Sequence, residues 1–282
     1  MKVRFGYSAS HVREPDEFLE LVDDLDRLQF DSVWLAEILG GPTPDPLSAL
    51  GIAAGRVSRL KLGSQIVVPG RQPARLAKEC ATLDRFSGGR FLLAFVPGLE
   101  DDDEIARMGV PKTDRGHLLE AGLLACRQSW ANDELRPGQT PLEVWLGGLG
   151  PKALERCGRV GDGWIPGLCT PEHAGKARLT ILEHASRFER EFSDEHFGAN
   201  VLYSTGEPPA EILARLAARR QPGIEVNPRD LVPTSWPALR SLIDRYLQAG
   251  FSKFVLRSAS SPTSPPTREL EELAAEILPL QS

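Results

Sequence analysis

The alternation of short apolar runs with longer helix-type runs constrains this chain most, because it repeats eight times within 282 residues. Most of the short runs are almost continuously apolar, which is typical of strands covered on both faces in a parallel sheet. The predicted strands span residues 3–8, 32–36, 61–68, 90–96, 143–147, 163–166, 200–205 and 253–257. Eight strand–helix repeats predict an α/β fold of the (β/α)8 TIM-barrel type, since a doubly wound sheet usually stops at about five or six strands.

Helical periodicity fills the segments between these strands. Residues 15–28 place Phe18, Leu21 and Leu25 on one face, with a proline near the start. Comparable patterns predict helices over residues 113–130, 236–249 and 268–278. A helical insertion is expected after the sixth strand, at residues 170–197, where a lid over the active face would be built, and a second excursion at residues 220–234. No linker separates the repeats, so we expect residues 1–282 to form a single domain.

Charge and hydropathy exclude several classes of protein. With 33 Lys and Arg against 39 Asp and Glu the net charge is −6, and the basic residues are spread along the chain, so nucleic acid is not an expected partner. No apolar run approaches the ~18 residues that cross a bilayer, and the first residues lack a signal-peptide core, so we expect a cytoplasmic protein without a membrane partner. Four cysteines without a CxxC pair predict small buried hydrophobes rather than a metal site: Cys80, Cys126, Cys157 and Cys169.

A glycine-rich turn is the clearest candidate site. The sequence WLGGLGPKAL, residues 145–154, carries a predicted strand into Gly147, Gly148 and Gly150, and Pro151 takes a favoured first position of a helix. Glycines let backbone N–H groups approach an anion, and a helix N-terminus adds positive partial charge, so this turn could hold a phosphate. Glycines also end strands and start turns, and on these residues alone both interpretations stay open. The chain has no Walker loop, GxGxxG fingerprint, GxSxG elbow or HExxH pair.

Five stretches of the chain resemble one known family. They are FDSVWLAE (residues 30–37), RLKLGSQIVVPGRQPARLAKECATLDRFSGGRFLLAFVPG (59–98), RMGVPKTDRGHLLEAG (107–122), PLEVWLGGLGPKALERCGRVGDGWIP (141–166) and AGFSKFVLR (249–257). In this order they are similar to the luciferase-like monooxygenase superfamily of flavin- and deazaflavin-dependent TIM-barrel oxidoreductases, and most similar to its F420-dependent members. SGGR before the fourth strand and GDGW at the sixth are the most specific pieces.

The resemblance implies coenzyme F420 as the cofactor, with FMN as the alternative. It implies a bulged third strand with a cis peptide between Gln65 and Ile66 under the cofactor ring, and a fourth-strand exit that borders the cofactor at Pro97 and Gly98. It assigns the phosphate of the cofactor tail to a loop of four residues: Gly147, Gly148, Leu149 and Gly150. The expected partners are a small-molecule substrate, a second copy of the chain in a homodimer and, for FMN, a separate flavin reductase.

Two positions depart from the family pattern. Many members have a histidine directly after the acidic residue that ends the second strand, where this chain has Ile38. The sugar-phosphate dehydrogenases carry a glutamate just after the fourth-strand glycine, where this chain has Leu99. A proton would then come from Glu37, His11 or Glu100. Glu37 is the predicted catalytic residue, because burial beside apolar neighbours raises the pKa of a carboxyl group.

Three functions stay open at this point: an F420-dependent oxidoreductase that transfers a hydride to or from a small organic substrate, an FMN-dependent monooxygenase, and a non-catalytic flavin-binding barrel. Other family-like residues are interpreted as structural. The fourth strand is preceded by a group that we expect to form the fold: Asp84, Arg85, Gly88, Gly89 and Arg90. Three tryptophans on predicted strands are expected in the core: Trp34, Trp145 and Trp164.

Overall fold

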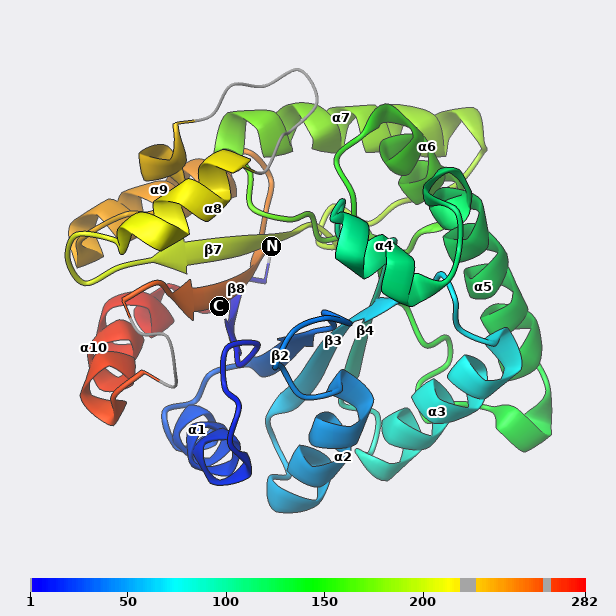
Figure 1. The fold of residues 1–282 in the computed structure, drawn as a ribbon, viewed down its shortest axis with the longest axis horizontal. Coiled ribbons are helices and arrows are strands. Elements are labelled where there is room, and N and C mark those ends of the chain that lie inside the picture. The colour runs from blue at the N-terminus through cyan, green and yellow to red at the C-terminus, as the bar shows by residue number, and fades with distance from the viewer. Residues whose placement is uncertain (1, 219–226, 261–264) are drawn as a thin grey trace.

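Eight parallel strands form one sheet that curls into a barrel in the computed structural model, which describes residues 2–218, 227–260 and 265–282 (Figure 1). They are β1 (Arg4–Ser8), β2 (Ser32–Ala36), β3 (Lys61–Val67), β4 (Phe91–Val96), β5 (Val144–Leu146), β6 (Gly163–Trp164), β7 (Gly198–Tyr203) and β8 (Lys253–Ser258). Their order across the sheet is β6-β5-β4-β3-β2-β1-β8-β7. The two ends meet at a parallel bridge between Trp164 and Phe197, beside which the Trp164 N–H donates to the His196 carbonyl at 2.9 Å. The predicted (β/α)8 barrel is confirmed.

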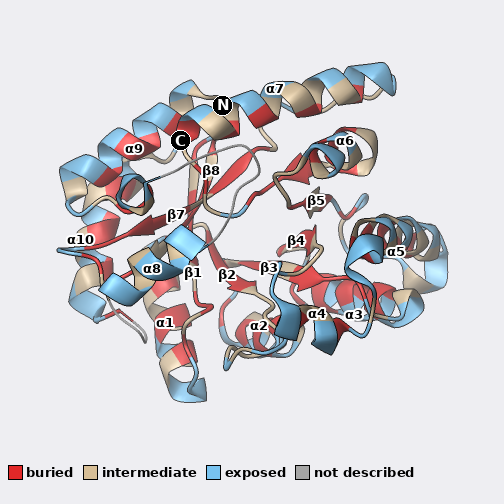
Figure 2. Ribbon diagram, turned by 45° about the horizontal axis from the view of Figure 1, so that its top comes forward, coloured by how far each residue is buried: buried red, intermediate tan, exposed pale blue. Residues whose placement is uncertain are grey.

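The helices surround the sheet and turn their buried sides toward it (Figures 1 and 2). Those in the ring are α1 (Pro15–Arg27), α2 (Pro46–Arg56), α3 (Pro73–Phe86), α5 (Arg115–Trp130), α6 (Pro151–Val160), α7 (Pro171–Arg187), α9 (Trp236–Gln248) and α10 (Thr267–Ile277). Further helices are α4 (Asp102–Met108) and α8 (Ala210–Ala218), with 3-10 turns η1 (Lys112–Asp114), η2 (Asp133–Leu135), η3 (Pro228–Leu231) and η4 (Leu278–Leu280). Six ring helices have a proline at the first or second position, where its fixed φ suits the helix. No helix of the described chain is long and apolar enough to cross a membrane.

The loops differ from prediction more than the strands do. The helix predicted after the sixth strand is α7, which lies in the ring as the crossover from β6 to β7 (Figure 1). The sequence did not predict α4, which lies beside the loops after β2 and β4; it is capped by the Asp101 side chain and ended by Gly109 at φ 67°. Of the excursion predicted at residues 220–234, residues 220–226 lie outside the described residues, and η3 follows them.

Two tryptophan side chains lie in the barrel interior, and each packs against glycines of neighbouring strands. Trp34 of β2 packs over Gly6 and Gly63, and a Cβ at Gly63 would stand 2.1 Å from the indole. Trp145 of β5 packs over Gly163, where a Cβ would stand 2.4 Å from the ring. An indole can occupy the interior at these levels only because the adjacent strands have no side chain there. Trp34 is buried, as predicted, and Trp145 is partly buried.

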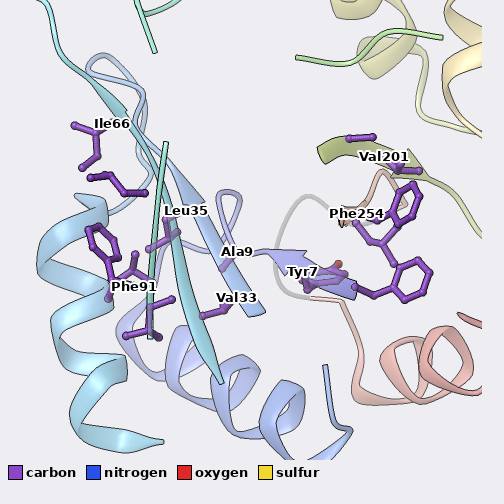
Figure 3. Packing of buried hydrophobic residues seen from close by; sticks show 14 of the residues in the cluster. Tyr7, Ala9, Val33, Leu35, Ile66, Phe91, Val201 and Phe254 are labelled. Carbon is purple, nitrogen blue, oxygen red and sulfur yellow. The ribbon is translucent and has the colours of Figure 1, made fainter. Parts of the chain in front are cut away.

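The larger apolar core lies between the barrel wall and the helices. Figure 3 shows Leu35, Ile66 and Phe91 gathered at one part of this core, and Tyr7 and Phe254 at another. These side chains alternate along each strand with residues that point into the barrel, so the strands are apolar on both faces. All four cysteines are buried as free thiols, as the sequence predicted.

The family-like residues at the amino ends of the strands make structural contacts. Asp84 accepts hydrogen bonds from the backbone N–H and the side-chain amide of Gln139, both at 2.7 Å. Arg90 donates to three backbone carbonyls of neighbouring segments. Asp162, from the GDGW sequence, accepts from the Arg127 guanidinium at 2.6 Å. These contacts join strands to helices, in agreement with a fold-forming role.

Candidate functional site

A cavity of about 290 Å³ opens at the carboxyl ends of the strands, the end at which (β/α)8 enzymes carry their active sites. Ile165 and Val255 line it from the barrel interior, and the two positions that depart from the family pattern, Ile38 and Leu99, line it nearer the rim. Six predicted site residues also line it: Glu37, Gln65, Pro97, Gly98, Gly147 and Gly148. Six of the nine predicted site residues thus line one cavity, and their functional role stays a prediction.

Three predicted cofactor-binding residues lie outside the cavity lining. Ile66 is fully buried in the core between the sheet and the helices, because side chains alternate along β3 and its neighbour Gln65 points into the barrel. Leu149 and Gly150 continue the turn from Gly148 to the start of α6. Ile66 therefore lies on the helix side of the sheet and does not face the cavity.

The prediction of a cis peptide between Gln65 and Ile66 is wrong, because this bond is trans. In the described chain the cis bond joins Thr140 to Pro141. At Gln65 the strand pairs with both β2 and β4, so the ladder is regular on its two sides. Such a ladder uses extended backbone with trans peptides, and the bulge that would accompany a cis bond is not formed in β3.

The turn between β5 and α6 presents backbone N–H groups. Gly148 has φ 109°, which favours glycine, and its carbonyl accepts a hydrogen bond from Trp164 Nε1 at 3.0 Å. Gly150 is the N-cap of α6, so no side chain caps the helix there. Within the described chain, the N–H groups of Gly148, Leu149 and Gly150 donate no hydrogen bond. Unpaired N–H groups at a helix N-terminus can bind an anion.

Glu37 is the carboxylate of this cavity. Its side chain is 9% exposed; one oxygen accepts from the Val67 N–H at 2.8 Å and the other from the Arg71 guanidinium at 2.6 Å. Burial raises the pKa of Glu37 above its ordinary value, and the charge of Arg71 opposes that rise. The group is thus fixed in position while its surroundings favour the protonated form more than water does.

The other two proton-donor candidates lie outside the cavity lining. His11 stands edge-on to Tyr7, with ring centroids 6.2 Å apart, and neither ring nitrogen has a hydrogen-bond partner in the described chain. Burial, with a smaller effect from Arg257, lowers the pKa of His11 to about 4, so the ring is neutral at pH 7. Glu100 is 70% exposed. Of the three candidates, Glu37 is the one that lines the cavity.

Two buried charged side chains fix the loops around the cavity. Arg115, at the start of α5, donates to the three carbonyls of residues 97–99 over 2.7–3.4 Å. Glu104, on α4, accepts from the N–H groups of Leu39 at 3.1 Å and Gly40 at 3.2 Å. Sequence reasoning missed both, because a charge that binds backbone atoms of a distant loop leaves no spacing pattern.

Four further polar side chains line the cavity and were not among the predicted site residues: Ser8, Ser10, Asn200 and Arg257. Ser10 Oγ accepts from the Ala36 N–H at 2.8 Å, which joins the exits of β1 and β2. Ser8, Ser10 and Arg257 lie at or just after the carboxyl ends of strands, where active-site residues are expected, whereas Asn200 lies within β7.

Comparison with known proteins identifies the family. The family model described as luciferase-like monooxygenase matches residues 3–249. The chain belongs to the luciferase-like monooxygenase family. The resemblance drawn from the sequence motifs is thereby confirmed, and membership of the family supports an oxidoreductase.

Individual members of the family and its structural neighbours match over the full length. The F420-dependent glucose-6-phosphate dehydrogenase of Beutenbergia cavernae is 26% identical, over 98% of this chain and 97% of that protein. An F420-dependent secondary alcohol dehydrogenase, solved with an F420-acetone adduct, aligns with a TM-score of 0.81 at 17% identity over 100% of both chains. A monooxygenase from Streptomyces bottropensis aligns with a TM-score of 0.75 at 19% identity, over 98% of this chain and 99% of that one. At these sequence identities, the two solved structures show that the fold is shared.

Proposed function

We propose that this luciferase-like family member is an oxidoreductase that moves a hydride between coenzyme F420 and a small organic substrate in the cavity at the carboxyl ends of the strands. The single observation that carries the proposal is the glycine turn before α6, which leaves three N–H groups of the described chain unpaired beside this cavity. The full-length similarity to an F420-dependent relative favours F420 as the cofactor. When bound, the deazaflavin supplies the hydride chemistry.

The residues of the turn fit a phosphate-bearing cofactor. The N–H groups of Gly148, Leu149 and Gly150 would hold the phosphate, and the N-terminus of α6 would add positive partial charge. Glycine keeps this cradle open, since a Cβ at Gly148 would stand 2.7 Å from the Ala153 side chain. The wall of the cavity that would border the ring consists of Gln65, Pro97 and Gly98.

Glu37 is the residue that we propose exchanges a proton with the substrate: its protonated form would donate to a carbonyl oxygen that receives hydride, and its ionised form would accept the hydroxyl proton of an alcohol that gives up hydride. Its position is fixed by Arg71 and by the Val67 N–H, and burial raises its pKa above the ordinary value of a glutamate. Ile38 follows Glu37 and adds an apolar side chain to the wall of the same cavity. A histidine at position 38 is therefore not the sole way to supply a proton here.

The substrate that we infer is small, and sugar phosphates are disfavoured. The cavity has room for a modest ligand, and Leu99 lines it where the family's sugar-phosphate dehydrogenases carry a glutamate. Glu100, one step later, is 70% exposed and lies outside the lining. Apolar residues such as Ile38, Leu99 and Val255 share the wall with polar ones that include Ser10, Asn200 and Arg257, and this mixture suits an alcohol or a ketone.

Titration and turnover test the proposal together. Purified protein is titrated with F420 and, separately, with FMN, and F420 absorbance is followed with a panel of secondary alcohols. We expect micromolar binding of F420, weaker binding of FMN, and F420 reduction by at least one alcohol of the panel. Binding of FMN alone, with oxygenation once a flavin reductase is added, would instead establish an FMN-dependent monooxygenase, the second candidate, which the family description favours. Binding without turnover on any substrate class would favour the non-catalytic barrel.

A homodimer is the assembly that we propose, formed through the outer faces of α2 and α3. A groove between these helices is lined by apolar residues that include Leu47, Gly51 and Phe86 and by charged residues that include Arg75, Lys78 and Glu79. Phe86, at the end of α3, is 81% exposed, and Ile52, which follows Gly51 in α2, is 60% exposed. Large apolar side chains exposed on neighbouring helices beside charged groups are typical of contact surfaces, and a glycine allows two helices to approach closely.

A further inference from the structure

A second chamber of about 160 Å³ lies inside the barrel, at the amino ends of the strands. Ile165 and Val255 line both this chamber and the upper cavity, so one layer of side chains separates the two spaces. The chamber walls include Trp34, Trp145 and Leu92, which belong to the same apolar cluster as that layer. Neither Glu37 nor the glycine turn at residues 147–150 lines the chamber.

The size and the walls of the chamber suit one aromatic ring. An engineered apolar cavity of about 150 Å³ in another protein binds benzene, so the volume here is sufficient for a single ring. Trp34 and Trp145 both line the space, and both are held by the glycines on which they lie. Fixed indoles offer an incoming ring the offset and edge contacts that aromatic groups prefer.

The mouth of the chamber is polar, with charges of both signs: Arg4, Lys61, Lys253, Asp31 and Glu143. Arg4 and Lys61 both lie within 3.4 Å of Asp31. Lys253 lies 3.9 Å from a glutamate of the neighbouring loop, Glu195, and His196 Nε2 lies 3.7 Å from Glu143. Since the three cations Arg4, Lys61 and Lys253 each lie within 3.9 Å of a carboxylate, the mouth favours a neutral ligand with a hydrogen-bonding group over an anion.

We propose that this chamber is a second binding site, which takes a neutral molecule with one aromatic ring and one hydroxyl or N–H group, of about the size of phenol. The ring lies in the barrel beside Trp34 and Trp145, and the polar group faces the mouth near Glu143 and His196. The site is separate from the cofactor and substrate cavity, so the proposal stands independently of the function proposed above.

Calorimetric titration with phenol tests this site, with two matched variants. Leu92→Phe narrows the chamber, whereas Ile38→Phe makes the same kind of change in the upper cavity, and neither residue lines the other space. We expect saturable one-to-one binding with a Kd of about 1 mM or lower. Leu92→Phe should weaken it at least about tenfold, and Ile38→Phe should change it less than about twofold. Absence of saturable binding, or the opposite ranking of the two variants, would overturn the proposal.

A second pair of measurements keeps the test decisive if Leu92→Phe does not fold. Leu92→Ala enlarges the chamber, so it should bind the larger two-ring molecule indole at least about fivefold more tightly than the parent chain does. In Ile38→Phe, whose upper cavity is narrowed, cyclohexanol, which has the size of phenol without an aromatic ring, should bind at least about fivefold more weakly than phenol. Unchanged indole binding, or equal binding of the two alcohols, would contradict an aromatic site in this chamber.

Discussion

Glu37 is held by two donors and yet has a raised pKa. The Val67 N–H and the Arg71 guanidinium favour its ionised form, but loss of water around the side chain disfavours that form more strongly. A raised pKa in a carboxyl group that lines a cavity is the property that a general acid needs near neutral pH.

Replacement of Glu37 by glutamine tests its proposed role. Glu37→Gln should lower turnover about 10²-fold, the usual scale for a lost general acid. Glutamine retains the size and an acceptor for the Val67 N–H, so the Kd for F420 should change by less than about threefold. Glu79→Gln is the matched control, since Glu79 also faces Arg71, at 3.5 Å, but lies outside the cavity lining. Turnover of Glu37→Gln within a few-fold of the parent would rule out the role.

His11 makes the free energy of unfolding depend on pH. Burial lowers its pKa from 6.5 to about 4, so between these values the unfolded chain binds more protons and stability falls as pH falls. The shift corresponds to about 3 kcal/mol across this window. Because its ring nitrogens have no partner in the described chain, His11→Phe should change stability little at pH 7.

Urea unfolding at pH 7 and at pH 4 measures this effect. We expect His11→Phe to be more stable than the parent by about 3 kcal/mol at pH 4, because phenylalanine takes up no proton. His117→Phe serves as the control, since His117 is exposed. Equal pH dependence in the parent and in His11→Phe would show that His11 is not buried in its neutral form.

At the scale of elements, the N-terminus of α6 is left uncapped. Gly150 has an ordinary φ of −72°, and beyond its chain neighbours no heavy atom of the described residues lies within 4 Å of the position that a Cβ would take. The fold therefore tolerates a side chain there, and aspartate and asparagine are both favoured N-caps. A helix that forgoes such a cap keeps its N–H groups available to a ligand.

Gly150→Asp and Gly150→Asn separate charge from shape at this position. Both should unfold at or above the parent's temperature, because both cap the helix. Only the aspartate repels a phosphate, so at low salt its Kd for F420 should rise at least about tenfold, while that of Gly150→Asn rises much less. Fluorescence titration of F420 measures both values. An equal Kd in the two variants would locate the phosphate elsewhere.

At the scale of the whole molecule, the stability of the barrel depends on how closely the Trp34 and Trp145 rings pack against strand glycines. Gly63→Ala should lower the free energy of unfolding by about 1–3 kcal/mol or more, because the new methyl group would stand 2.1 Å from the Trp34 ring. Gly55→Ala, in α2, meets nothing of the described chain within 4 Å and should raise stability by about 0.5–1 kcal/mol. Denaturant unfolding compares the two. If Gly63→Ala left the free energy of unfolding unchanged, the interior of the barrel would be loosely packed.

The proposed dimer is also a property of the whole molecule. Light scattering should give the parent a mass of twice 30.9 kDa, and Phe86→Glu should halve it, because a charge would be buried at the contact. Leu179→Glu, at a leucine on α7 that is 63% exposed, should leave the mass unchanged. A parent chain that runs as a monomer would contradict the assembly.

The barrel, and the cavity that six of the predicted site residues line, follow from local patterns in the sequence. Strand runs such as residues 32–36 carry their own periodicity, and the glycine turn at residues 147–150 is one contiguous segment. The cis peptide at Gln65 was predicted wrongly, since peptide geometry there depends on the pairing of β3 with two neighbours. A single domain over residues 1–282 stays a prediction.

By itself the sequence determined the eight strand–helix units, their order and the face on which their exits meet, because hydrophobic periodicity and turn residues act over a few neighbouring positions. Only the tertiary structure decided that Arg71 pairs with Glu37, that Arg115 holds residues 97–99 and that two indoles leave a chamber beneath the floor of the site. These outcomes depend on distances between segments far apart in the chain, and such distances arise from the packing of the whole barrel, which no local pattern encodes.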